Sequence, residues 1–325
     1  MNTGETVVRS LLVSALSLMV FLVACSGGMS NQRGSGGGAT YLPNGDVRHS
    51  VVIFGENVSF DHYFGTYPIA VIKAGEPPFT AAAATPVPDG LSGTLLTANP
   101  NATNPDNGAA ATNPFRLDRA QAATADQDHA YAPEETAFDG GAMDRFPYAV
   151  GSADSEALAA RTNAAKIAAS KGLTMGYYDG NTVTALWNYA QHYALNDHSF
   201  GTTFGPSTVG AINLISEQTN GAVAGLNANG VLASGGNGEF TLMNDASPIG
   251  DICSKTTEAS VSMSGTNIGD LLTSAGISWG WFEGGFNLSL TNANGTTGCS
   301  RSTVSAITGV QFADYLPITE PFQYY

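Results

Sequence analysis

The sequence predicts an α/β layered fold, because short apolar runs typical of strands alternate with segments of helical period. The first run, residues 51–54, reads Val-Val-Ile-Phe and stops at Gly55, as expected of a buried strand in a parallel sheet. Residues 267–275 favour a helix that stops at Gly276, and residues 277–282 favour the next strand. Alternation of strand, helix and strand is the mark of a layered α/β domain.

Three more helices are expected between these segments. Residues 154–171 are dominated by Ala, Leu, Glu and Lys, which favour a helix. A second helix is expected after Asn181, where apolar residues that include a core tryptophan recur at helical spacing. A third follows Pro206, with the hydroxyl of Ser207 or Thr208 placed to cap its first N–H groups.

Length and charge limit the functions open to the chain. Its 325 residues are enough for one large domain or two ordinary ones. With 12 Lys+Arg against 27 Asp+Glu, the formal net charge of -15 leaves no basic surface for a nucleic-acid backbone, so no nucleic-acid partner is expected. Residues 81–114 are rich in Ala, Pro, Asn and Thr without a period, which predicts a long surface excursion.

Residues 1–24 are typical of an export signal. The apolar run over residues 10–24 carries no charge and is short for a permanent membrane helix. It ends in Leu-Val-Ala-Cys, which resembles the bacterial lipobox, so Cys25 is expected to carry lipid and begin the mature chain. A cleaved secretory signal with an incidental cysteine is the alternative. Residues 25–45 are a Gly/Ser-rich tether, which leaves residues 46–325 as the folded domain.

Export also bears on the other two cysteines. With Cys25 lipidated, Cys253 and Cys299 are the only thiols left, and an oxidising envelope favours a disulfide between them. Two free buried thiols are the alternative. The lipid anchor would make the membrane a partner of the chain. The protein is therefore expected in the cell envelope, on the periplasmic or outer surface, or it is secreted.

Four blocks of sequence carry a resemblance to a known family. They are residues 56–68, which begin Glu-Asn-Val-Ser-Phe-Asp-His-Tyr-Phe-Gly, residues 126–144, residues 196–207 and residues 314–325. Their order and spacing resemble the bacterial phosphoesterase family that contains phosphocholine-type phospholipases C and certain acid phosphatases. The resemblance implies an alkaline-phosphatase-like α/β/α sandwich with a mostly parallel central sheet, and hydrolysis of a phosphate ester.

The resemblance also implies roles for single residues. Glu56 and Asn57 would ligate a divalent metal cation, since hard cations prefer carboxylate and amide oxygens. Ser207 would be the nucleophile, at a helix start whose field favours an alkoxide and a phosphate, with Thr208 as the alternative. His129 would contact the phosphoryl oxygens or protonate the leaving group. The expected path is attack on phosphorus, a phosphoseryl intermediate and then attack by water.

The remaining histidines are expected to be structural. Asp61 and His62 lie inside the first block and are interpreted as supporting residues. His192 is expected on a helix face and His198 in a turn, rather than as metal ligands. His49 precedes the first predicted strand and is given no role.

Two departures from the family pattern matter. The family usually carries two adjacent histidines before Pro-Phe-Gln-Tyr-Tyr, whereas this chain has Ile318-Thr319, which cannot replace the donor, acceptor or proton of an imidazole. Family members also continue further, with later acidic residues that complete the metal site. The chain is therefore interpreted as an N-terminal fragment whose sheet is incomplete at the C-terminus.

The most specific function expected is phospholipase C-type cleavage of a phospholipid. A phosphomonoesterase of the acid phosphatase type, acting on a small phosphate ester, is the nearest alternative. A non-catalytic surface lipoprotein that keeps the scaffold is the alternative from another class.

Overall fold

The computed structural model describes residues 49–325 except 53, 55–57, 122, 152–171, 199–200, 202 and 307–308. The chain divides into two units, and everything from Phe54 to Tyr325 belongs to the second. The predicted signal, Cys25, the tether and the predicted helix over residues 154–171 lie outside the described residues.

The largest sheet has five strands in the order β4-β5-β3-β7-β6. They are β3 Asn220–Ala224, β4 Leu232–Gly236, β5 Glu239–Leu242, β6 Ser247–Pro248 and β7 Ser260–Met263. Only the pair β6 and β7 is parallel, and the other three pairs are antiparallel. Strands β4 and β5 are joined by Asn237 and Gly238, both at positive φ, which is the chemistry of a tight hairpin turn.

The expected α/β class is confirmed, but the expected mostly parallel sheet is wrong for the described residues. The fold is mixed α/β, but within the described residues the sheet is not mostly parallel. A hairpin such as β4-β5 pairs strands that follow each other directly, so no crossover helix is needed and the strands run antiparallel.

Four short strands pair outside this sheet. They are β1 Phe115–Arg116 with β2 Gly176–Tyr177, in parallel, and β8 Ser302–Val304 with β9 Gln311–Ala313, antiparallel. Beyond β2, the N–H of Tyr178 donates to the carbonyl of His62 at 2.7 Å. Three segments that are distant in the sequence therefore meet at residues 176–178.

Seven α-helices are described. They are α1 Phe60–Phe64, α2 Pro100–Thr103, α3 Tyr131–Phe138, α4 Phe146–Ala149, α6 Thr184–His192, α7 Ser207–Ser216 and α8 Ile268–Ser274. The predictions of α6, α7 and α8 are confirmed, and a capping box of Asn267 and Asp270 begins α8. Among the described residues, no helix has the length and apolar character needed to cross a membrane.

Short 3-10 helices connect these elements. They are η1 Gly93–Leu96, η2 Pro105–Ala110, η3 Arg119–Gln121, η4 Asp139–Gly141, η6 Leu173–Met175, η7 Gly298–Ser300, η8 Pro317–Thr319 and η9 Pro321–Tyr324.

Two predicted strands are wrong. The described part of residues 51–54 is irregular and exposed, because a four-residue apolar run does not by itself specify a pairing partner. Residues 277–282 are irregular as well. There Trp279 and Trp281 pack on the ring of Phe322, with ring centroids 4.7 and 5.7 Å apart, so aromatic contacts take the place of a strand ladder.

Residues 81–114 do not form a simple surface loop, because part of the segment is buried. Three of their asparagines, Asn99, Asn101 and Asn107, are almost fully buried. Asn101 donates to the carbonyl of Met143 at 2.8 Å, which ties this segment to the region between α3 and α4. Buried side-chain amides that satisfy loop backbone groups leave no periodic signature in a sequence.

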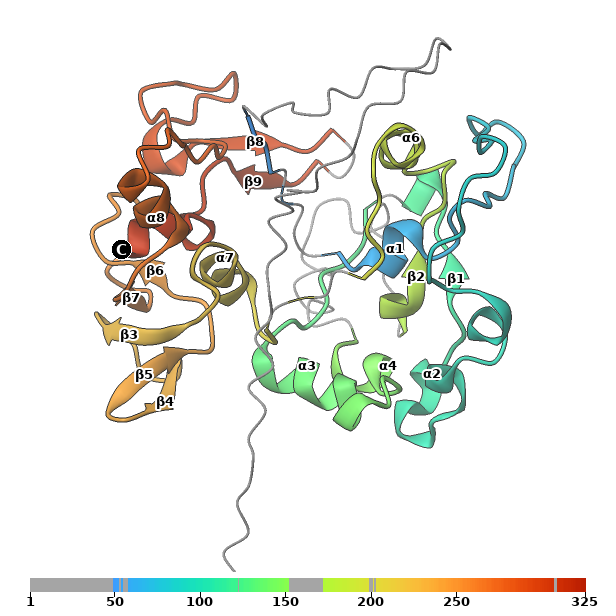
Figure 1. The fold of residues 1–325 in the computed structure, drawn as a ribbon, viewed down its shortest axis with the longest axis horizontal. Helices are drawn as coiled ribbons and strands as arrows, with labels where there is room; N and C mark the ends of the chain where they lie inside the picture. The colour runs from blue at the N-terminus through green and yellow to red at the C-terminus, as the bar shows by residue number, and fades with distance from the viewer. Residues whose placement is uncertain are drawn as a thin grey trace, which may run out of the picture. The chain divides into compact units, whose positions relative to one another are not determined.

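The core that concerns the site lies under α7. Val209 and Ile212 of α7 are almost fully buried against Leu242 of β5 and Val261 of β7, with Tyr324 in the same cluster. A separate cluster surrounds Trp187, as predicted, through edge-to-face contacts. Helix α7 lies beside this sheet (Figure 1), and its apolar face packs into the core.

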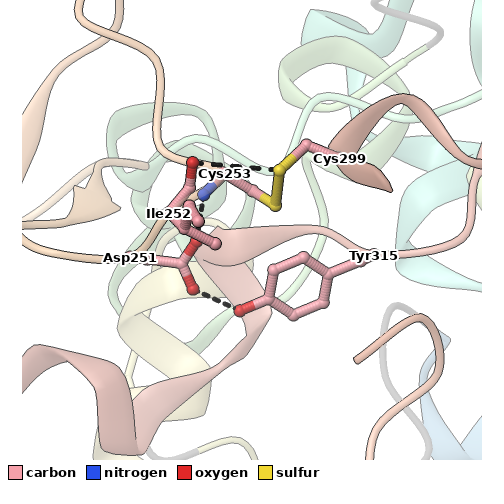
Figure 2. The surroundings of a disulfide bond; sticks show 5 residues. All are labelled: Asp251, Ile252, Cys253, Cys299 and Tyr315. Carbon is pink, nitrogen blue, oxygen red and sulfur yellow. Dashed lines mark hydrogen bonds between the residues drawn. A yellow bond between two sulfur atoms is a disulfide. The ribbon is translucent and has the colours of Figure 1, made fainter. Parts of the chain in front are cut away.

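Cys253 and Cys299, the two cysteines predicted to pair, are joined by a disulfide bond. Figure 2 shows Asp251 beside it, where one carboxylate oxygen accepts the Cys253 N–H at 2.7 Å. The other oxygen accepts the hydroxyl of Tyr315. Asp251 therefore links the disulfide loop to the segment that leads into η8.

Candidate active site

The turn before α7 requires glycine. Gly205 has φ 116°, and a Cβ there would lie 2.8 Å from Cγ2 of Val209. Its N–H donates to a carboxylate oxygen of Glu134 at 2.7 Å. Pro206 then occupies the N-cap position with extended backbone, so Ser207 is the first residue of the helix, as the sequence predicts.

A distant carboxylate, rather than a local hydroxyl, satisfies the next donor of the helix. Oδ1 of Asp245 accepts the backbone N–H of Thr208 at 3.0 Å and its hydroxyl at 2.7 Å. Thr208 is completely buried, whereas Ser207 is half-buried. The hydroxyl of Thr208, the alternative nucleophile, is therefore buried and donated to Asp245.

His129 belongs to the same electrostatic neighbourhood. Its Nδ1 lies 2.8 Å from the carbonyl oxygen of Gln127. Burial lowers the pKa of His129, but that hydrogen bond and the charges of Asp126, Asp245 and Glu134 outweigh it and raise the pKa above 6.5. His129 thus senses both carboxylates that hold the start of α7, which favours a protonated imidazole.

The pKa of Glu134 is also shifted by its surroundings. Burial raises the pKa of Glu134, against the opposing effects of the Gly205 N–H and the charge of His129, and with a further rise from Asp128. The surroundings of His129 are therefore rich in carboxyl groups.

The segment with Ile318 and Thr319 also packs against α7. Both residues belong to η8, at the positions where the resemblance leads one to expect histidines. The hydroxyl of Thr319 donates to Oε1 of Glu283 at 2.6 Å. Tyr324 donates to the carbonyl of Ala246 at 2.5 Å, and burial raises the pKa of Tyr324. These residues support the helix and supply no imidazole.

The predicted metal ligands Glu56 and Asn57 lie outside the described residues. The helix that follows them, α1, carries His62, whose Nδ1 lies 2.8 Å from the hydroxyl of Ser59. Burial lowers the pKa of His62, which favours the neutral imidazole of a supporting residue.

A second group of side chains has the composition of a metal site. Asp89, Asp197 and His198 each offer a ligand atom, and these atoms lie within 4.8 Å of one another. Nδ1 of His198 is 2.8 Å from Asp197, and Nε2 is 3.6 Å from Asp89. Two carboxylates and an imidazole are a donor set that a divalent cation such as Zn²⁺ or Mn²⁺ accepts.

The same group is held together without a metal. The hydrogen bond and charge of Asp197 raise the pKa of His198, and the protonated ring then pairs with both carboxylates. A cation would have to displace that proton. The sequence places His198 in a turn but gives no sign of its proximity to Asp89, because 108 residues separate Asp89 from Asp197.

Comparison with known proteins gives one clear match. The family model described as the Phosphoesterase family matches residues 47–322, which is most of the chain. The matched region includes α7, His129 and the Asp89 group. A search of curated proteins found no match.

Proposed function

This chain belongs to the phosphoesterase family, and from that premise we propose that it is a phospholipase C-type hydrolase that cuts the glycerol side of a phospholipid phosphate. Membership implies phosphate-ester hydrolysis, and the choice of substrate and residues is the proposal. The observation that carries it is the start of α7. Ser207 is half-buried there, beside a Thr208 that Asp245 holds in the interior.

The position of Ser207 suits a nucleophile that attacks phosphorus. The first N–H groups of a helix bear partial positive charge, which stabilises an alkoxide and the oxygens of a phosphate. The apolar face of α7 is locked in the core, so its first residue has a defined direction.

His129 is the proposed acid. Ser207 releases its hydroxyl proton to solvent as Oγ bonds to phosphorus. The bond from phosphorus to the glycerol oxygen breaks, and that oxygen takes a proton from His129. The raised pKa of His129 favours the protonated imidazole that this role requires. Water would then attack the phosphoserine, release the phosphorylated headgroup and restore the hydroxyl.

Glu56 and Asn57 remain the proposed ligands of a divalent cation, which would lower the pKa of the attacking hydroxyl when bound. Their carboxylate and amide oxygens suit a hard cation. Among the described residues, the Asp89, Asp197 and His198 group has a donor set that fits a divalent cation.

The charge near His129 favours a zwitterionic phospholipid over a phosphomonoester. Asp126, Glu134 and Asp245 act on His129, and Asp128 acts on Glu134. Carboxylates repel the dianion of a monoester and attract the cationic end of a choline-type headgroup. The proposed lipid on Cys25 would keep the enzyme at the membrane that supplies such a substrate.

The test is turnover of phosphatidylcholine vesicles and of a chromogenic phosphomonoester by the full chain, beside Ser207→Ala. Ser216→Ala, at the other end of α7, is the matched control and should keep the wild-type rate. We expect Ser207→Ala to lose activity on phosphatidylcholine. Equal rates for wild type and Ser207→Ala on both substrates would refute the proposed enzyme and favour the alternative of a non-catalytic lipoprotein. A preference for the monoester would favour the acid phosphatase alternative.

A further inference from the structure

The C-terminal segment contains a buried carboxyl group whose hydrogen bonds are incomplete. Glu320 lies between η8 and η9 and is only 3% exposed. Its Oε1 accepts the N–H of Phe322 at 3.2 Å. Its Oε2 is buried, and no donor among the described residues reaches it. An ionised carboxylate with a bare oxygen in such a place is costly.

The partner of Glu320 is another carboxyl group, that of Glu283, with which it makes a side-chain hydrogen bond. Two ionised carboxylates have only acceptors, so this bond exists only if one of them carries a proton.

The donors around Glu283 support the same conclusion. The hydroxyl of Thr319 lies 2.6 Å from Oε1 of Glu283 and 2.8 Å from the carbonyl oxygen of Leu316. A hydroxyl has one proton and can donate to only one of these acceptors. Glu283 also accepts the indole N–H of Trp281 at its other oxygen, at 3.3 Å, so Glu283 is the acceptor of the pair and the proton resides on Glu320.

The neighbouring elements bring further negative or neutral groups. Asp251 adds negative charge to Glu320, and the hydroxyls of Tyr315 and Tyr324 are electrostatically coupled to the same cluster. Within the described part of the chain, no Lys, Arg or His forms an ion pair with Glu320 or Glu283. Burial first, and the charge of Glu283 next, raise the pKa of Glu320 to about 8.

We propose that Glu283 and Glu320 share one proton, and that this proton fastens residues 317–324 to residues 281–283. The fastened segment carries Phe322, which packs on Trp281, and Tyr324, which lies in the core beneath α7. Loss of the proton places two like charges in contact and loosens this support. The proposal concerns the stability of the segment and does not depend on the proposed enzymatic activity.

The first test is the pH dependence of unfolding of the full chain. A carboxyl group with a pKa of 4.5 in the unfolded chain and about 8 in the folded chain makes the folded state bind more protons between those values. Its contribution to stability is complete below pH 4.5 and is lost as the pH rises through about 8. We expect the unfolding constant of the wild type to rise by up to about tenfold per pH unit relative to Glu320→Gln.

The control is Glu135→Gln on the exposed face of α3, which should keep the wild-type dependence. Glu320→Gln keeps the shape of the side chain and supplies an N–H where the proton was. If Glu320→Gln and the wild type follow parallel pH curves, the shared proton is refuted. Glu283→Gln should also flatten the curve, which covers the case in which Glu320→Gln does not fold.

The second test identifies what sits between the carboxyl groups. The infrared spectrum of the wild type at pH 6 should contain a protonated carboxylic acid band that is missing in both Gln variants. A bound cation is the competing occupant. If chelator destabilises the wild type and leaves Glu320→Gln unchanged, and the acid band is absent, the pair holds a metal and the proposal fails.

Discussion

Oδ1 of Asp245 holds Thr208 by two hydrogen bonds, one from the backbone N–H at 3.0 Å and one from the hydroxyl at 2.7 Å. This carboxylate caps α7 from 37 residues away and contributes to the field at His129. Because a negative charge at a helix start is stabilising, Asp245→Asn should lower the free energy of unfolding by about 1–2 kcal/mol. Thr208→Val loses only the hydroxyl bond and should cost about 1 kcal/mol. Urea unfolding measures both changes, and an Asp245→Asn protein as stable as the wild type would contradict the capping role.

Alanine substitutions at Gly205 and Gly210 should change the stability of the protein in opposite directions. Gly205→Ala forces an L side chain into φ 116° with a Cβ 2.8 Å from Val209, so it should destabilise the protein by about 1–3 kcal/mol. Gly210 lies inside α7 with nothing within 4 Å of its Cβ position, so Gly210→Ala should stabilise by about 0.5–1 kcal/mol. Thermal unfolding compares the two variants. Equal effects would mean that the backbone of the turn is not the cause.

The pH profile of hydrolysis should report His129. An acid with a pKa raised above 6.5 donates its proton below that pKa, so kcat/KM should fall as the pH rises through the raised value. Asp126→Asn removes one of the charges that raise the pKa and should move this alkaline limb to lower pH. Asp118→Asn, whose carboxylate faces Lys73, is the control that leaves the limb in place. If Asp126→Asn leaves the alkaline limb of the pH profile unchanged, a group other than His129 is titrating.

The disulfide should contribute strongly to stability. It closes a loop of sequence separation 46, for which chain entropy predicts about 4 kcal/mol. The double variant Cys253→Ser/Cys299→Ser should melt at lower temperature by a corresponding amount. Reductant should lower the melting temperature of the wild type toward that of the variant and leave the variant unchanged. No shift with reductant would show that the two thiols do not pair in solution.

Local features of the fold could be read from the sequence. The starts of α7 and α8 follow Gly-Pro and capping-box chemistry, and the buried position of Trp187 follows from helical spacing. The hairpin of β4 and β5 also has a sequence signal, the pair Asn237-Gly238, which is not among the expectations above.

Contacts between distant residues could not be read in this way. Glu134 holds Gly205 from 71 residues away, and Asp197 meets Asp89 across 108 residues. A carboxylate of this kind has no neighbours in the sequence that mark it as a cap or as part of a cluster. The mostly parallel sheet is what the family resemblance implies, and the apolar run over residues 51–54 specifies neither a partner strand nor its direction.

The pairing of β1 with β2 and of Tyr178 with His62 has a consequence for biosynthesis. His62, Phe115 and Arg116 reach these hydrogen-bonding partners only after residues 176–178 have left the ribosome. Tyr67 and Phe79 wait longer still, until Trp187 of α6, on which their rings pack, has also emerged. The nascent chain must therefore carry exposed apolar surface through the translation of the whole intervening stretch, a period in which a holding chaperone has something to bind.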